Sequence, residues 1–288
     1  MSSAASVGFR AAQCNIGKLS MDSEKKAVEQ FWDKASCGED LYLQNQQRDG
    51  YLEHARLRYE LEPVIEEFAE FSAAAGKQVL EIGVGLGADH QRFAQAGAHL
   101  TGIDLTARAV THTRRRLAMF GFNSALSIGD AENLEFPSDA FDLVYSWGVL
   151  HHSPNTPRAV SEVHRVLRPG GVAKVMIYHK WSLVGYMLWI RYALLRLRPW
   201  MTLTEIYARY LESPGTKAYS AGEAKRIFAS FADVQIRTWL THADLLESAA
   251  GQRHGGAILS LGRRILPRRL LRRCAGSHGL FMLIQAVK

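Results

Sequence analysis

The chain has 288 residues, 47% of them hydrophobic, so it is long enough for one large domain with appendages. Its formal net charge of +7 is unevenly placed: seven arginines but no Asp or Glu follow Glu247. Because the basic excess is local, the composition excludes a protein whose whole surface is built for nucleic acid, and no nucleic-acid partner is expected.

The cysteines and the first residues of the chain indicate the cellular compartment. Cys14, Cys37 and Cys274 are odd in number and far apart, which argues against a disulfide framework and predicts a reducing, cytoplasmic setting. Residues 1–22 are small and polar, so we expect a flexible tail rather than a signal peptide. The longest apolar stretch, 183–197, contains two arginines and is shorter than the roughly 20 residues that span a bilayer.

Residues 23–76 are expected to form an N-terminal helical cap. They hold few glycines, and Val64, Ile65, Phe68 and Phe71 have the spacing of one buried helix face. Trp32 either packs in the core of this cap or covers a bound ligand, and the sequence leaves both readings open.

Strand and helix patterns alternate regularly through residues 77–180. Thr106 is the expected N-cap of one helix, and Pro157 is expected at the first position of another, behind Thr156. The predicted strands are 79–82, 99–105, 125–128, 141–146 and 172–177. Repeated βα units of this length predict an α/β fold with a doubly wound parallel sheet and right-handed crossovers.

Two later strands are predicted at 234–240 and 280–287, after a helix whose capping box is Ser220 with Glu223. Residues 220–288 are therefore expected to complete the sheet, with a basic insertion at 248–276.

A glycine-rich turn follows the first strand. Gly83, Gly85 and Gly87 alternate with apolar residues, and Glu81 precedes them by two positions. Glycine lets the backbone take positive φ and approach a ligand closely. The spacing G-x-G-x-G differs from the dinucleotide fingerprint G-x-G-x-x-G.

Acidic residues end the next two strands. Asp104 is placed to accept hydrogen bonds from ribose hydroxyls, and Asp130, before Ala131, to accept from an adenine amino group. Ligands of such sheets lie outside the carboxyl ends of the strands, so these loops are expected to converge on one cleft.

With these motifs the chain resembles class I S-adenosylmethionine-dependent methyltransferases, in the small-molecule subgroup of the methyltransferase type 11 kind. The resemblance covers residues 77–180. Its motifs are Glu81 to Gly87, Gly102-Ile103-Asp104, Gly129-Asp130-Ala131-Glu132, Phe141 to Val144 with Val149-Leu150-His151-His152, and Val166 to Gly171.

The resemblance implies a Rossmann-like seven-stranded sheet whose last strand is antiparallel. It also implies S-adenosylmethionine as cofactor and S-adenosylhomocysteine as product. The cofactor-binding residues it implies are Glu81, Gly83, Gly85, Gly87, Asp104, Leu105, Asp130, Ala131 and Ser146.

In that family the methyl group lies toward the end of the fourth strand, so any proton-accepting base belongs there or at the end of the fifth. The candidates are His151, His152, Tyr178 and His179. None of the four has a carboxylate at metal-ligand spacing in the sequence, so no metal site is expected.

Residues 181–219 are expected to form a helical lid that selects the acceptor. Trp181, Tyr186, Trp189, Tyr192 and Trp200 either line an apolar pocket there or pack the helices together.

The stretch 263–273 alternates arginine pairs with apolar pairs. It forms either a solvated or partner-facing helix or one in weak contact with a membrane surface.

The leading hypothesis is a cytoplasmic methyltransferase that acts on a small organic acceptor. The alternatives are a membrane-peripheral lipid or quinone methyltransferase, an RNA or protein methyltransferase, and a non-catalytic cofactor-binding module. The acceptor, the atom that is methylated and the oligomeric state stay open at this point.

Overall fold

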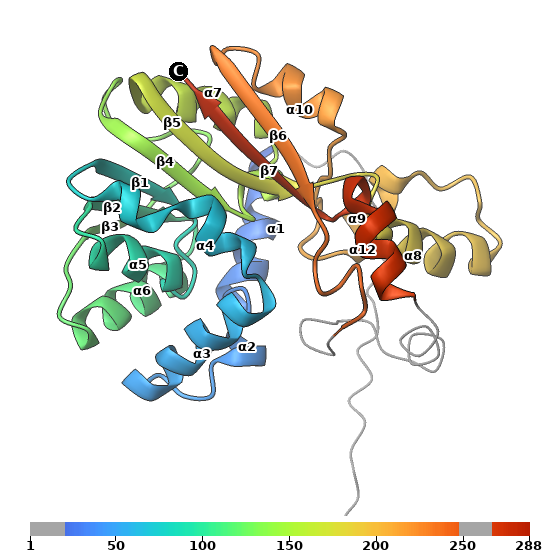
Figure 1. Cartoon of the computed structure of the whole chain (residues 1–288), viewed down its shortest axis with the longest axis horizontal. Helices are drawn as coiled ribbons and strands as arrows, with labels where there is room; N and C mark the ends of the chain where they lie inside the picture. The colour runs from blue at the N-terminus through green and yellow to red at the C-terminus, as the bar shows by residue number, and fades with distance from the viewer. Residues whose placement is uncertain (1–20, 248–266) are drawn as a thin grey trace, which may run out of the picture.

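Seven strands form one sheet in the order β3-β2-β1-β4-β5-β7-β6 (Figure 1). The computed structural model describes residues 21–247 and 267–288. Strands β1 to β5 pair in parallel, and β7 runs antiparallel to β5 and β6. The strands are β1 (Gln78–Ile82), β2 (His99–Asp104), β3 (Ala125–Ile128), β4 (Phe141–Trp147), β5 (Leu167–Tyr178), β6 (Asp233–Trp239) and β7 (Phe281–Val287). This confirms the predicted Rossmann-like sheet with its last strand antiparallel.

Helices cover both faces of the sheet and its carboxyl-end edge. The α-helices are α1 (Met21–Lys34), α2 (Glu39–Tyr42), α3 (Arg48–Leu61), α4 (Val64–Ala69), α5 (Ala88–Gln95), α6 (Ala107–Met119), α7 (Thr156–Val166), α8 (Leu183–Tyr192), α9 (Leu203–Tyr210), α10 (Ala221–Ile227) and α12 (Arg268–Cys274). The 3₁₀-helices are η1 (Phe71–Ala74), η2 (Leu150–His152), η3 (Leu194–Arg196) and η4 (Gly276–His278).

The core has two halves because successive strand residues point to opposite faces. On β1, Leu80 and Ile82 pack with α7 and α10, whereas Val79 packs with α4, η1 and α5. All three side chains are buried, and each contributes about 1.5–3 kcal/mol by leaving water. The sheet is therefore a rigid base, and the loops at the carboxyl ends of its strands are free to carry a site.

Several local predictions are confirmed and two are corrected. The side chain of Thr106 caps α6, and Ser220 with Glu223 forms the capping box of α10. Helix α7, however, is capped by Asn155, whose side chain accepts from the backbone N–H of Arg158. Thr156 is the first residue of the helix, and its hydroxyl donates to the carbonyl of Leu150 rather than capping the helix.

The start of β5 is the second correction. The strand begins at Leu167, which pairs with Phe141, and the pairing then shifts to Leu143 with Val172. Residues 168–171, predicted to lie before the strand, form the irregularity between these pairs.

Parts of the predicted appendages lie outside the described residues, namely 1–20 of the tail and 248–266 of the basic insertion. Within the two described ranges, no helix combines the length and apolar character that crossing a bilayer requires.

Candidate functional site

A cavity of about 1020 Å³ lies at the carboxyl ends of the strands. One wall consists of the loops after β1, β2, β3 and β4, and the opposite wall of residues from α1, α3 and α8. Ligand pockets in proteins are roughly 300–1,000 Å³, so this one has room for a nucleotide-sized molecule and a second ligand.

The glycine loop forms the floor of the cavity with a backbone that other residues would strain. Gly83, Gly85 and Gly87 have φ of 84°, 51° and 73°. A Cβ on Gly83 would lie 2.1 Å from the Val149 side chain, whereas one on Gly85 would meet nothing within 4 Å. Gly83 is thus required for packing of the loop against Val149, and Gly85 leaves open space for a ligand.

Asp104 is held rigidly at the end of β2 and lines the cavity. Its Oδ2 accepts from the N–H of Gly85 at 3.1 Å, and its Oδ1 accepts from the N–H and hydroxyl of Thr106 at 3.0 and 2.9 Å. Burial raises the pKa of Asp104, and these hydrogen bonds oppose that rise. Oδ1 thus has both lone pairs engaged by Thr106, whereas Oδ2 keeps one lone pair for a further donor such as a ribose hydroxyl.

Asp130 also lines the cavity, beside Ala131 and near Leu105. Its Oδ2 lies 2.5 Å from Nζ of Lys25, a residue of α1. Lys25 also pairs with Glu132 at 3.1 Å. Helix α1 therefore closes this end of the cavity by an ion pair that the sequence did not predict.

Glu81 reaches the cavity from β1 and is almost fully buried. Its Oε2 lies 2.8 Å from Nδ1 of His90, whose Nε2 lies 2.8 Å from the Ser124 hydroxyl. Burial, followed by the charge of Asp89, raises the pKa of Glu81 well above its usual value, and burial lowers the pKa of His90 to about 3.

The direction of hydrogen bonding in this chain follows from Ser124. Its hydroxyl donates to the carbonyl of Leu100, so a neutral His90 donates from Nε2 and accepts at Nδ1. The hydrogen between Glu81 and His90 therefore belongs to Glu81, in agreement with its raised pKa.

Ser146 does not face the cavity. It is fully buried, and its hydroxyl donates to the carbonyl of Ile82 at 3.1 Å. Its side chain ties β4 to β1.

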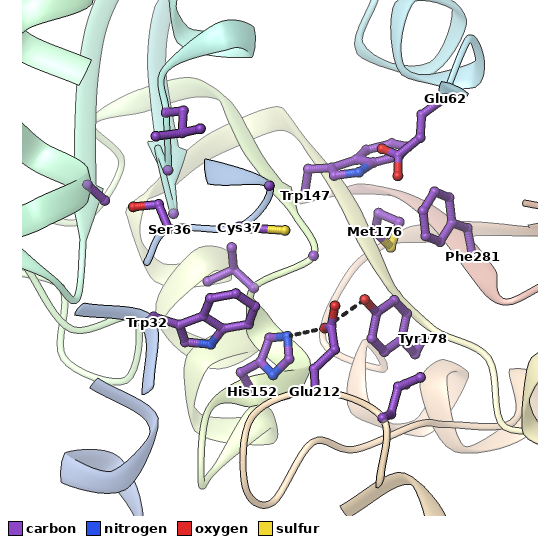
Figure 2. Close-up of a pocket in the computed structure, with 18 of the residues that line it drawn as sticks. Trp32, Ser36, Cys37, Glu62, Trp147, His152, Met176, Tyr178, Glu212 and Phe281 are labelled. Atoms are coloured by element: carbon purple, nitrogen blue, oxygen red, sulfur yellow. Dashed lines mark hydrogen bonds and ion pairs between the residues drawn. The ribbon is translucent and has the colours of Figure 1, made fainter. Parts of the chain in front are cut away.

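Three polar side chains meet at the other end of the cavity (Figure 2). The Tyr178 hydroxyl donates to Oε2 of Glu212 at 2.8 Å, and Nε2 of His152 lies 3.3 Å from the same oxygen. Nδ1 of His152 lies 2.8 Å from the Ser213 hydroxyl. Burial, followed by Glu212, raises the pKa of Tyr178 well above its usual value, so the phenol stays a donor.

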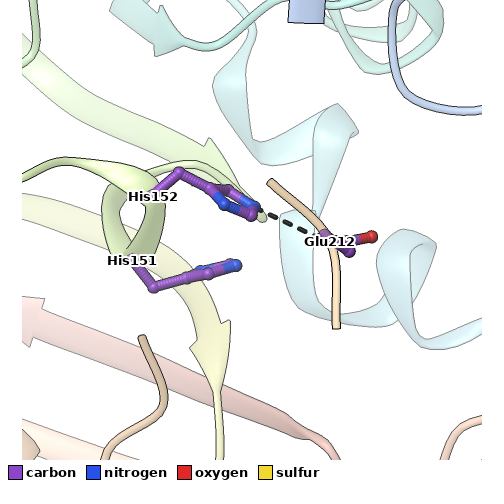
Figure 3. Close-up of side chains that lie close together, drawn as sticks. All are labelled: His151, His152 and Glu212. Atoms are coloured by element: carbon purple, nitrogen blue, oxygen red, sulfur yellow. Dashed lines mark ion pairs between the residues drawn. The ribbon is translucent and has the colours of Figure 1, made fainter. Parts of the chain in front are cut away.

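Glu212 overturns one sequence-based argument. The four base candidates have no carboxylate nearby in the sequence, but the fold brings Glu212 from the segment after α9 against His152 and Tyr178. Ligand atoms of His151, His152 and Glu212 lie within 4.8 Å of one another (Figure 3). Tyr178 and His152 therefore share one oxygen of the Glu212 carboxylate.

The other two base candidates lie behind the cavity wall. His151 is fully buried, its ring centroid lies 4.1 Å from that of Tyr178, and neither ring nitrogen has a hydrogen-bond partner among the described residues. Burial lowers the pKa of His151 well below its usual value. His179 is buried with Nδ1 3.3 Å from the carbonyl of Gly279. Both support the Tyr178 end of β5 rather than face the cavity.

Trp32 faces the ligand space. It lines the cavity, and its ring meets that of His152 edge-on, with centroids 5.3 Å apart. Of the two readings of Trp32, the structure favours the one in which it covers a ligand.

The α8 side of the cavity is aliphatic. It contributes Val184, Met187, Leu188, Ile190 and Arg191. The five aromatics predicted there are absent from the lining, so the pocket reading of them is wrong. Two examples show why: the Trp189 indole donates to the carbonyl of Met201, and Tyr192 stacks on Tyr210.

The central part of the chain is similar in sequence to known methyltransferases. Residues 79–171 match a family model described as a methyltransferase domain. The chain is 30% identical over 154 residues to malonyl-[acyl-carrier protein] O-methyltransferase of Pectobacterium atrosepticum, covering 54% of each chain. It is 35% identical over 127 residues to demethylmenaquinone methyltransferase of Tropheryma whipplei, covering 43% of this chain and 52% of that one. The chain thus spans about half the length of these curated relatives.

A solved structure shares the fold over most of the chain. Phosphoethanolamine N-methyltransferase 2 of Haemonchus contortus, in complex with S-adenosyl-L-methionine, superposes with a TM-score of 0.59 at 18% identity. The match covers 91% of this chain and 60% of that one.

Proposed function

We propose that this chain, whose residues 79–171 match a family model described as a methyltransferase domain, transfers the methyl group of S-adenosylmethionine to a small organic acceptor and releases S-adenosylhomocysteine. One observation carries the proposal: the same cavity has the glycine loop and Asp104 at one end and His152, Tyr178 and Glu212 at the other.

The residues of the first end fit the cofactor. Asp104 receives the ribose hydroxyls, and Leu105, Asp130 and Ala131 surround the adenine. The ion pair between Lys25 and Asp130 loosens so that Asp130 can accept a hydrogen bond from the adenine. The glycine loop lies along the methionine portion, with Glu81 beneath it. When bound, the cofactor supplies an electrophilic sulfonium methyl group.

The residues of the second end position the acceptor and take its proton. A hydroxyl or protonated amine that gains a methyl group must lose a proton, so a base beside it speeds transfer. We assign this role to His152 and Glu212 acting as a pair. Tyr178 orients the carboxylate of Glu212, Ser213 orients the ring of His152, and Trp32 excludes water over them.

The aliphatic α8 wall favours an acceptor with a substantial apolar part. Arg191, which also lines the cavity, favours an acidic or otherwise electron-rich group on it. A lipid or quinone methyltransferase at a membrane surface, working from the cytoplasm, is the second candidate that this wall supports.

The test is to incubate the purified protein with methyl-labelled S-adenosylmethionine and cell extract, then locate the label by mass spectrometry. Label in a small-molecule or lipid fraction supports the proposal. Binding of the cofactor without any transfer to extract would instead indicate a non-catalytic module.

Variants of the proposed base sharpen this test. His152→Asn and Glu212→Gln should each lower kcat/KM by about 10²–10⁴-fold with cofactor Kd unchanged, since they remove proton acceptance only. His99→Asn, at an exposed position at the start of β2, is the matched control. Equal loss of activity in His99→Asn, or full activity in both site variants, would refute the assignment.

A further inference from the structure

The chain that leaves α8 presents large apolar side chains to solvent. Leu195, Leu197 and Trp200 are 59%, 83% and 75% exposed, and Ile190 and Leu194 beside them are exposed as well. We call residues 190–200 the exposed tip; it follows α8 at the right of Figure 1. A cluster of this kind usually marks a contact with another protein or with a membrane.

The backbone holds one of these side chains in a costly conformation. Leu197 has φ of 56°, in the left-handed region, which costs a non-glycine residue about 1–2 kcal/mol. This conformation ends η3, as a left-handed residue commonly does at a helix C-terminus, and leaves the Leu197 side chain 83% exposed.

The charges of the tip complement an anionic surface. Residues 181–203 contain Arg191, Arg196 and Arg198 but no Asp or Glu. Arg196 and Arg198 are exposed beside the apolar side chains. Apolar residues that enter the acyl boundary, with arginines at headgroup level, are the pattern of a protein that lies on an anionic bilayer.

The tip is continuous with the cavity. Ile190, Arg191 and Leu195 belong both to the tip and to the cavity lining. An apolar acceptor can therefore pass from a bilayer into the cavity along these residues without crossing water.

We propose that the exposed tip docks on an anionic lipid bilayer and that an apolar acceptor enters the cavity from there. Docking is independent of the reaction, while the entry route rests on the proposed methyl transfer.

The tip is a better docking surface than the arginine-rich stretch 263–273. Residues 263–266 lie outside the described part of the chain. In α12, Arg268 donates to the carbonyls of Leu245 and Leu246, and Arg272 pairs with Glu247. Arg268 is thus only partly exposed, and the exposed Arg272 is already paired with a carboxylate.

Flotation of the full chain with vesicles tests the proposal. We expect binding to phosphatidylcholine vesicles that contain phosphatidylglycerol and much weaker binding to phosphatidylcholine alone. The double variant Leu197→Glu/Trp200→Glu should lose binding to both. Arg196→Glu/Arg198→Glu should weaken binding to the anionic vesicles at least about ten-fold, since each arginine near the surface contributes about 1 kcal/mol.

Two controls match these changes elsewhere. Leu52→Glu replaces a half-exposed leucine of α3, and Arg114→Glu/Arg115→Glu makes the same charge change on α6. Absence of vesicle binding, equal binding to both vesicle types, or equal losses in the controls would overturn the docking proposal.

Cofactor titration of the same preparations separates the two proposals. Docking variants that bind cofactor normally, and methylate a detergent-dispersed acceptor at the wild-type rate, locate the defect at the bilayer. Vesicle binding by a wild-type protein that fails to bind cofactor would instead refute the proposed function alone.

Discussion

At the scale of single residues, the proposed cofactor end of the cavity depends on carboxylates whose hydrogen bonds are set by the backbone. Asp104 accepts from Gly85 and Thr106, so its position is fixed before any ligand arrives. Fixed acceptors bind a ligand without an ordering cost.

Asp104→Ala should therefore lower the affinity for S-adenosylhomocysteine at least about 100-fold, because hydrogen bonds to a charged group contribute about 1.5–3 kcal/mol each. Isothermal titration calorimetry measures this. Asp104→Asn, which keeps the shape and one of the two acceptor oxygens, should lose less. Unchanged affinity in Asp104→Ala would refute the placement of the ribose.

Glu81 makes stability depend on pH. Its pKa is raised in the folded state, mainly by burial, so the folded protein holds a proton that the unfolded chain releases. Between the usual glutamate range and the raised value, the folded state binds more protons than the unfolded state, so stability falls as pH rises.

Glu81→Gln removes this titration and keeps a donor toward His90. The variant should be more stable than the wild type at neutral and alkaline pH, and the difference should shrink as pH falls toward the usual glutamate range. Urea unfolding at a series of pH values measures it. Parallel stability profiles for the two proteins would contradict a raised pKa.

At the scale of elements, α8 lines the cavity, α9 leads into Glu212, and both helices are joined to the sheet by Tyr207. The Tyr207 hydroxyl lies 2.7 Å from that of Ser182, the N-cap of α8, and donates to the carbonyl of His179 just after β5. The position of α8 is thus tied to the strand end that carries Tyr178.

Gly185→Ala should disturb this junction, because a Cβ there would lie 2.3 Å from the Tyr207 hydroxyl. We expect a loss of about 1–3 kcal/mol of stability and a higher KM for the acceptor. The cofactor Kd should stay the same. Gly222→Ala, in α10, where an added Cβ meets nothing within 4 Å, is the control and should not destabilise. A normal acceptor KM in Gly185→Ala would show that α8 does not set acceptor binding.

At the scale of the whole molecule, buried charges join the N-terminal helices to the sheet domain. Arg58 of α3 pairs with Asp89 of α5 at 2.7 Å. Burial by itself would raise the pKa of Asp89, but Arg58 and the hydroxyls of Tyr145 and Tyr59 hold it below its usual value. Because these contacts connect the wall above the cavity to the floor below it, a ligand between them should stabilise the entire fold.

S-adenosylhomocysteine at 100 times its Kd should therefore raise stability by about 2.7 kcal/mol and Tm by about 5 °C or more. NAD at the same concentration should leave Tm unchanged. Differential scanning fluorimetry measures both. Stabilisation by NAD, or none by S-adenosylhomocysteine, would contradict the cofactor assignment.

Local patterns in the sequence were sufficient for the sheet and for most of the loops at its carboxyl ends. Strand and helix periods, the caps Thr106 and Ser220, and the glycine spacing act over a few residues, so they can be read without knowing the fold. The chain order of βα units then determines which loop ends converge.

Contacts between distant segments were decided only by the tertiary structure. Glu212 lies in a segment with no motif, 60 positions from His152, and Lys25 reaches Asp130 across 105 positions. Residues 181–219 are rich in aromatic side chains, as a pocket would require, but helix packing directs aliphatic side chains of this segment to the cavity instead. The sequence by itself determined the strand ends of the proposed cofactor half of the site, but not its closure by Lys25. The proposed acceptor half required the fold, because it is built from side chains that meet only after long loops close.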